Sequence, residues 1–143
     1  QTIAGNGGKG KVLFSSKDTP GLIPDLLVFR DDVVKDRAED VQKIVDAWFD
    51  ALDYFQTHEQ EAIDLMAKKA ETTPEDFKTG LDSVSIFTVE DNVQAFKDMD
   101  SFESLIHTGE LTAEFLKKLD MIDTIPDIEK LLEPKFVNHA AKR

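Results

Sequence analysis

The segment "AEDVQKIVDAWFDALDYFQ", residues 38–56, decides how this chain folds. Its apolar side chains recur at intervals of three and four residues, which places them along one side of an α-helix. They are Val41, Ile44, Val45, Trp48, Phe49, Leu52 and Phe55. Because an apolar stripe of this length must pack against other elements, the pattern predicts a helix-rich domain built around this segment. Core packing also explains the aromatic residues of the stripe better than a ligand-stacking site does.

Further helices are predicted towards the C-terminus from residues that cap helix starts. The capping pairs are Thr57 with Gln60, Thr73 with Asp76, and Thr88 with Asp91. In each pair the side chains satisfy backbone N–H groups that a helix start leaves unpaired. A proline at the first helical position, Pro74, strengthens the second start. Residues 101–106, 112–121 and part of 123–143 are predicted as additional helices.

Three short segments are predicted as strands. They are "KVLFSS" (residues 11–16), Leu26 to Phe29, and "SVSIFT" from Ser83 to Thr88. Each is rich in residues that favour a pleated backbone or alternates polar and apolar residues. The expected fold class is therefore α/β to α+β and helix-rich, with about seven helices and three short strands.

The glycine-rich stretch "GNGGKGK", residues 5–11, does not form a nucleotide-binding P-loop. Gly5, Gly10 and Lys11 satisfy the spacing, but Val12 stands where the magnesium-binding Ser or Thr belongs. The predicted strand also follows the glycines, whereas in a P-loop it precedes them. A flexible loop leading into a strand is the better interpretation.

Composition excludes several classes of function. The formal net charge of −12 argues against nucleic acid and anionic membranes as partners, because phosphate binding requires a basic surface. The absence of cysteine excludes disulfides, thiolate metal sites and cysteine nucleophiles, and leaves the compartment open. No apolar run approaches the roughly 18 residues of a membrane span. Because the chain begins with Gln1, it is expected to be a processed or truncated product.

No set of residues points to a metal site or to catalysis. His58, His107 and His139 lack the one-turn spacing of a zinc motif. The segment "DMDSFE", residues 98–103, begins like a calcium loop but has glutamate where that loop requires glycine. No acid, base and nucleophile stand together, so we expect neither an enzyme nor a bound cofactor.

The loop "SSKDTPGLIPD", residues 15–25, is the strongest candidate for a binding site in the sequence. Its hydroxyl and carboxylate side chains sit on a backbone restrained by Pro20, Gly21 and Pro24. Small-molecule pockets use such groups to orient polar ligands. An ordinary structured connection explains the loop equally well, and the residues leave both interpretations open.

Residues 10–81, together with "VEDNVQAF" (89–96) and "TAEFLKKLDMID" (112–123), resemble the C-terminal part of a known family. The family comprises the periplasmic substrate-binding proteins of ABC importers for nitrate, sulfonates, taurine, bicarbonate and thiamine precursors. The resemblance implies a two-lobed, type II-like periplasmic binding protein that closes at a hinge over a small ligand. It also implies an ABC permease as partner, and a location in the periplasm or at a lipid anchor outside the cytoplasm.

The resemblance places the loop at the border of the ligand cleft. It implies residues 1–25 as the end of the second lobe, and residues 26–143 as the hinge strand and the helical C-terminal part of the first. The implied ligand-binding residues are Ser15, Ser16, Asp18, Thr19 and Asp25. Asp25 is suited to receive a ligand amine or ammonium. A capping or hinge hydrogen bond is the alternative role for Asp25.

The chain does not include the part of the family's sequence that forms the first lobe and most of the second. We therefore expect the chain by itself to bind the family's ligands only weakly, and expect uncovered apolar faces to favour a homo-oligomer or swapped assembly. Two alternatives remain. One is an acidic helical domain that binds a protein partner, and the other is an enzyme whose carboxylates meet only in the fold.

Overall fold

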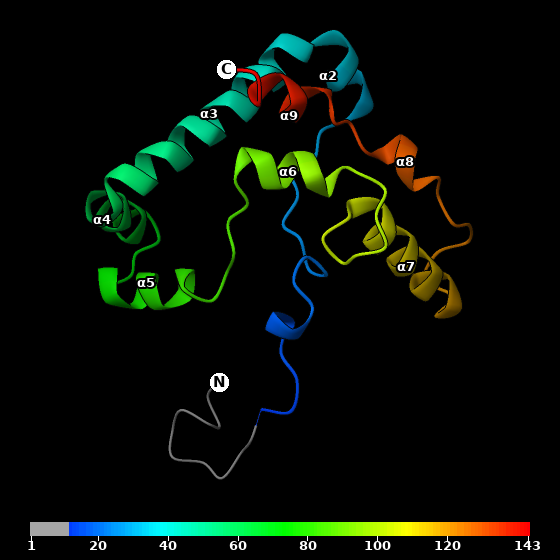
Figure 1. Ribbon diagram of the computed structural model, residues 1–143, viewed down its shortest axis with the longest axis horizontal. Coiled ribbons are helices and arrows are strands. Elements are labelled where there is room, and N and C mark those ends of the chain that lie inside the picture. Colours follow the sequence, from blue (N-terminus) through cyan, green and yellow to red (C-terminus); the bar gives the residue numbers. More distant parts are fainter. Residues whose placement is uncertain (1–11) are drawn as a thin grey trace. The chain divides into compact units, whose positions relative to one another are not determined.

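The computed structural model describes residues 12–143, and every regular element in that range is helical (Figure 1). No strand forms among these residues, so the predicted α/β to α+β fold is wrong. The glycine-rich stretch with Gly5, Gly10 and Lys11 lies outside the described residues. The elements are the 3-10 helix η1 (Ser16–Asp18) and the α-helices α2 (Asp31–Asp36), α3 (Ala38–Thr57), α4 (Glu59–Lys69), α5 (Pro74–Leu81), α6 (Val89–Ala95), α7 (Leu105–Lys118), α8 (Ile128–Leu131) and α9 (Lys135–Ala140).

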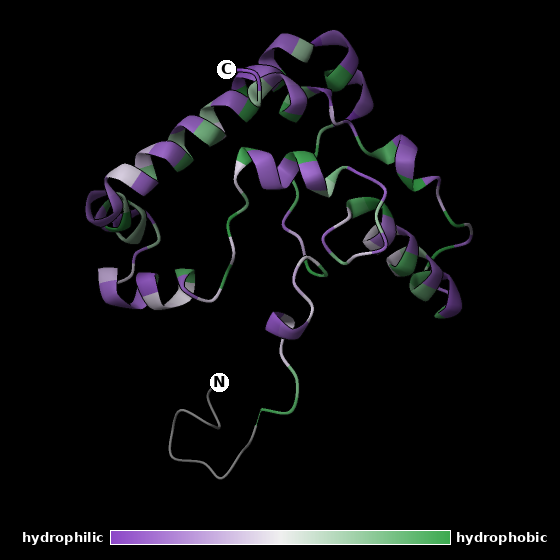
Figure 2. Ribbon diagram, in the orientation of Figure 1, coloured by the Kyte–Doolittle hydropathy of each residue, from purple (hydrophilic) through white to green (hydrophobic). Residues whose placement is uncertain are grey.

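The three segments predicted as strands lack regular secondary structure over most of their length. Residues 12–15, 24–30 and 85–88 are irregular, although Figure 2 shows hydrophobic residues in the first two. A strand is stable only when a neighbouring strand pairs with its backbone, and no described segment does so here. Their apolar side chains stay largely in solvent, with Leu13 92% and Val28 78% exposed.

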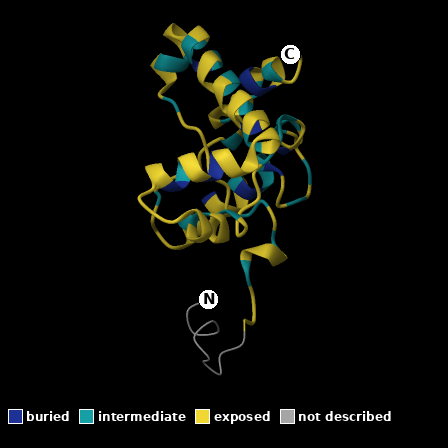
Figure 3. Cartoon of the chain, turned by 90° about the vertical axis from the view of Figure 1, so that its left-hand side faces the viewer, coloured by how far each residue is buried: buried dark blue, intermediate teal, exposed yellow. Residues whose placement is uncertain are grey.

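The chain divides into two compact units, each described by itself. Unit 1 contains residues 12–27 and 95–132 of the described range, and unit 2 contains residues 28–94 and 133–143. In unit 2 the long helix α3 packs against α2, α4 and α9, and α4 also packs against α5. Figure 3 shows that exposed residues prevail along the helices and that buried ones are few.

The core of unit 2 lies where α4 and α9 contact α3. Val41 and Leu52 of α3, Ile63 and Ala67 of α4, and Phe136 and Val137 of α9 are buried. Polar contacts hold α9 in place, because the Gln42 side-chain amide donates to the carbonyl of Phe136 at 3.0 Å. Near the C-terminus, Arg143 contacts Asp50 at 2.9 Å and Asp46 at 3.3 Å. The stripe predicted on residues 38–56 is thus only partly covered, and Trp48 remains 56% exposed.

Two of the three predicted helix caps are confirmed. The Thr73 hydroxyl accepts a hydrogen bond from the N–H of Asp76 at 3.1 Å, and the Thr88 hydroxyl accepts one from the N–H of Asp91 at 3.2 Å. The prediction for Thr57 is wrong. Helix α3 continues through Thr57, whose hydroxyl donates back to the Asp53 carbonyl at 2.9 Å, and His58 precedes α4.

In unit 1 the predicted helices at 101–106 and 112–121 are replaced by one helix, α7. Its N-cap is Ser104, whose hydroxyl accepts from the N–H of His107 at 3.3 Å and donates to the carbonyl of Lys97 at 2.7 Å. Gly109 lies within α7, and a Cβ placed there would come 2.7 Å from Ile128 of α8. The glycine therefore permits close packing of α8 on α7 without ending the helix.

Candidate functional site

The loop of residues 15–25 begins as a short capped turn in unit 1. The N–H of Ser15 donates to the Asp18 carboxylate at 2.8 Å, and the N–H of Asp18 donates to the Ser15 carbonyl at 3.0 Å. These reciprocal bonds define η1. At least one carboxylate oxygen of Asp18 is therefore engaged in holding the backbone of the turn. Ser15 and Asp18 are brought together as neighbours of one turn.

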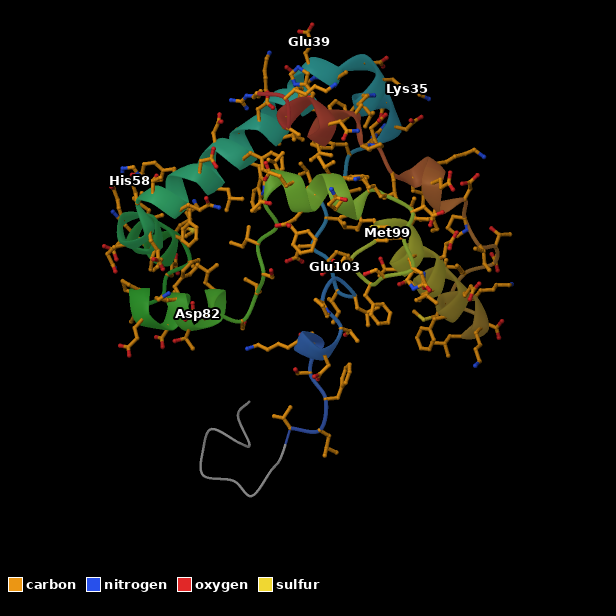
Figure 4. The ribbon with its side chains drawn as sticks, in the orientation of Figure 1. Lys35, Glu39, His58, Asp82, Met99 and Glu103 are labelled. Atoms are coloured by element: carbon orange, nitrogen blue, oxygen red, sulfur yellow. The ribbon has the colours of Figure 1, made fainter. Side chains whose placement is uncertain are left out.

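Beyond η1 the loop passes close to the turn that precedes α7. Gly21 has φ +87°, a conformation that favours glycine. A Cβ on Gly21 would lie 2.3 Å from the carbonyl oxygen of Phe102 and 2.8 Å from the Cα of Glu103. Glu103 is labelled in Figure 4. Close approach of these two backbones, more than eighty residues apart in the sequence, fixes the position of the loop.

Thr19 is the residue of the predicted set with an unsatisfied polar atom. Its hydroxyl oxygen is buried and has no hydrogen-bond partner among the described residues. Thr19 still contributes backbone bonds, because its N–H donates to the Ser16 carbonyl and its own carbonyl accepts from Leu22. A buried hydroxyl that lacks a partner costs stability, so such an atom calls for a specific explanation.

The other two predicted site residues are exposed. Ser16 begins η1, and Asp25 lies in the irregular segment 24–30. Asp25 has no hydrogen-bond or ion-pair partner in the described part of the chain, so the alternative role, a capping or hinge hydrogen bond, is not seen there. The structure thus places Ser15, Ser16, Asp18 and Thr19 in one turn and leaves Asp25 beyond it.

Two features of the described residues bear on metal binding and on acid–base chemistry. No group of three or more His, Asp or Glu side chains among residues 12–143 is arranged to hold a metal ion. The pKa of Asp40 is lowered by Arg37, and the pKa of Asp127 is lowered by Lys130, through hydrogen bonds and charge. Carboxylates held ionised in this way are poor general acids at neutral pH.

The turn at residues 101–104 is the part of this region that the sequence prediction missed. It was predicted as the start of a helix, yet a Ser three residues before His107 and directly before the apolar pair Leu105 and Ile106 is a recognisable N-cap.

None of the helices in residues 12–143 is long and apolar enough to cross a membrane. No family model, no curated protein and no solved structure matches this chain.

Proposed function

We propose that this chain forms part of the solute-binding component of an ABC importer. It takes part in binding a small anion or a small organic nutrient and in handing it to the permease, in the periplasm or at a lipid anchor outside the cytoplasmic membrane. The proposal is supported by the resemblance over residues 10–81, 89–96 and 112–123. Binding requires no covalent chemistry, since ligand affinity for a closed state is sufficient to drive closure.

The buried hydroxyl of Thr19 is the observation that carries the proposal. It belongs to the set of residues that the resemblance assigns to the ligand, and it lacks a hydrogen-bond partner among the described residues. A threonine hydroxyl can both donate and accept. It therefore suits an oxyanion, an amine or a hydroxyl of a small polar solute, which would supply the missing hydrogen bond.

Exposure of the neighbouring apolar side chains supports a role within a larger assembly. Leu26, Leu27 and Val28 follow the loop directly and are all largely exposed. A contiguous exposed apolar segment marks a surface that another polypeptide covers. We accordingly expect the chain to act with further protein surface and to bind solute weakly when isolated.

Thermal unfolding of the isolated chain with nitrate, taurine, an alkanesulfonate or bicarbonate tests the proposal. A solute present at ten times its Kd adds roughly 1.4 kcal/mol to the stability of the folded state. We expect one solute of the panel, at millimolar concentration, to raise the Tm of the wild-type chain. Thr19→Val replaces the hydroxyl with a methyl group of similar size and is expected to abolish this rise.

The same substitution has an opposite effect on stability without solute. Because the hydroxyl is buried without a partner in the described chain, Thr19→Val is expected to leave the Tm unchanged or to raise it. The corresponding gain in the free energy of unfolding is at most about 3 kcal/mol. Thr112→Val, at an exposed position of α7, is the matched control and should retain the solute response. A panel that leaves the Tm of the wild-type chain unmoved, or a response that survives Thr19→Val, contradicts the proposal.

A further inference from the structure

A groove in unit 2 lies apart from the loop discussed above. It is bounded by the end of α3, the start of α4, the helix α5 and the segment after α5, and it encloses about 590 Å³. Its apolar lining consists of Leu52, Phe55, Leu81, Val84 and Ile86. We call it the α3–α5 groove. Helix α4 packs against both α3 and α5 and so connects the two walls.

The apolar lining of the groove is open to solvent on one side. Leu52 at its base is buried, whereas Val84 is 57% exposed and Ile86 is also exposed. Small molecules bind where most of their surface becomes buried, which a groove this open does not provide. A longer apolar surface that lies along the groove, such as one face of a helix, would cover these side chains.

Charge at the rim determines which kind of helix fits. Lys78 is the only cation among the described residues that line the groove, and its ammonium lies 3.1 Å from Glu59 and 3.2 Å from Asp82. The hydrogen bond to Glu59 raises the pKa of Lys78 the most, and the hydrogen bond to Asp82 raises it further. The lysine therefore stays charged and paired. Figure 4 labels Asp82 at the end of α5. Two carboxylates thus share one cation, and the rim is net negative.

The surrounding unit reinforces this negative potential. Residues 28–94 and 133–143 contain eighteen acidic and ten basic side chains, a formal charge of −8. A second copy of this acidic chain would be repelled, whereas a cationic partner would be attracted and steered towards the groove. Since two of the walls are helices and no described strand edge borders the groove, a helix lying in a groove is the applicable mode of recognition.

We propose that the α3–α5 groove binds a cationic amphipathic helix of a partner protein. The apolar face of that helix covers Val84 and Ile86, and its lysine or arginine side chains pair with Glu59 and Asp82. This inference does not depend on the solute-binding proposal. It gives the alternative of an acidic helical interaction domain a defined surface and a defined partner chemistry.

Fluorescence anisotropy with a labelled model helix tests the proposal on the full chain. The probe is a 14-residue Leu/Lys peptide with leucines on one face, and its controls are a Leu/Glu peptide of the same pattern and a Leu/Lys peptide of scrambled order. We expect saturable 1:1 binding of the amphipathic Leu/Lys peptide alone. Raising the salt to 0.5 M should weaken binding several-fold, because it screens the exposed carboxylates.

Variants of the chain localise the binding. Val84→Ser with Ile86→Ser removes exposed apolar surface without disturbing buried residues. This double variant should bind the peptide at least tenfold more weakly than the wild type does. Leu65→Ser, on the exposed side of α4, is the matched control and should bind as the wild type does. Glu59→Gln with Asp82→Asn should also weaken binding about tenfold, whereas Asp64→Asn with Glu90→Gln, which changes the net charge equally, should not.

Three results would overturn the proposal. The first is equal binding by the groove variant and the Leu65→Ser control, which would indicate unspecific attraction to an acidic protein. The second is an equal loss of peptide binding in the variant Glu59→Gln with Asp82→Asn and in the variant Asp64→Asn with Glu90→Gln. The third is sedimentation of the wild-type chain as a dimer that Val84→Ser with Ile86→Ser returns to monomer, because the occupant of the groove would then be a second copy. Circular dichroism of every variant verifies that the helices are retained.

Discussion

Ile63→Ala is expected to lower the free energy of unfolding by about 2–5 kcal/mol, the usual cost of truncating a buried Ile to Ala. Ile63 is 2% exposed, and it lies on α4, the helix that connects α3 with α5. Domains of this size are stable by only about 5–15 kcal/mol. Because few large side chains are buried in unit 2, loss of this one should melt much of its helical structure at moderate urea concentration.

Urea denaturation followed by circular dichroism at 222 nm measures this effect. Leu65→Ala is the matched control, since Leu65 lies two residues away on α4 and is exposed. Alanine is as good a helix former as leucine, so the control should change stability by less than about 0.5 kcal/mol. Equal midpoints for the two variants would show that α4 does not bury Ile63 against its neighbours.

Gly21→Ala is expected to destabilise unit 1 by roughly 1–3 kcal/mol from the unfavourable backbone conformation alone. The steric conflict adds to this cost, because the new Cβ would lie 2.3 Å from the carbonyl oxygen of Phe102. The loop must therefore move away from the turn before α7. The displacement should also change the amide NMR shifts of Phe102 and Glu103, and it should remove any solute response that depends on Thr19.

Gly80→Ala is the matched control and should have the opposite sign. Gly80 lies in α5, and a Cβ placed there would meet no atom within 4 Å other than the neighbouring backbone of its own helix. Alanine is favoured over glycine in a helix by roughly 0.5–1 kcal/mol. Thermal unfolding of both variants provides the comparison, and a destabilising Gly80→Ala or a neutral Gly21→Ala would contradict the positions of these glycines.

Helices were predicted well wherever the signal lies within a few consecutive residues. The stripe from Val41 to Phe55 predicted a helix at 38–56, and the structure has one at Ala38–Thr57. The caps at Thr73 and Thr88 were also predicted, because each bond spans three residues. The cap predicted at Thr57 was wrong because a threonine hydroxyl can donate to a carbonyl of the preceding turn as well as accept from a following N–H.

Strands were predicted wrongly because their stability depends on a partner that local sequence does not specify. The apolar run Leu26 to Phe29 is not helical in the structure, as its composition suggested, but no described backbone pairs with it to form a sheet. The single helix α7 was missed for a related reason. Gly109 is tolerated within α7, where Ile128 packs against it, and the two residues are distant in the sequence.

For the candidate site, the sequence predicted the chemical groups but not their surroundings. It selected the loop of residues 15–25 from its hydroxyls, carboxylates and turn residues. It did not show that the Asp18 carboxylate caps its own turn, or that the hydroxyl of Thr19 is buried without a partner in the described chain. Burial of one atom depends on every segment around it, including the turn at Phe102.

By itself, the sequence determined the helix at residues 38–56, the helix starts at Thr73 and Thr88, the acidic charge and the absence of cysteine, since these properties depend on composition or on near neighbours. Only the tertiary structure decided that no described segments pair as strands, that Gly21 meets Phe102, and that Glu59, Lys78 and Asp82 assemble beside an apolar groove. The physical reason is distance along the chain. Contacts between remote residues form when packing outweighs the entropy of closing the loops between them, and no local pattern encodes that balance.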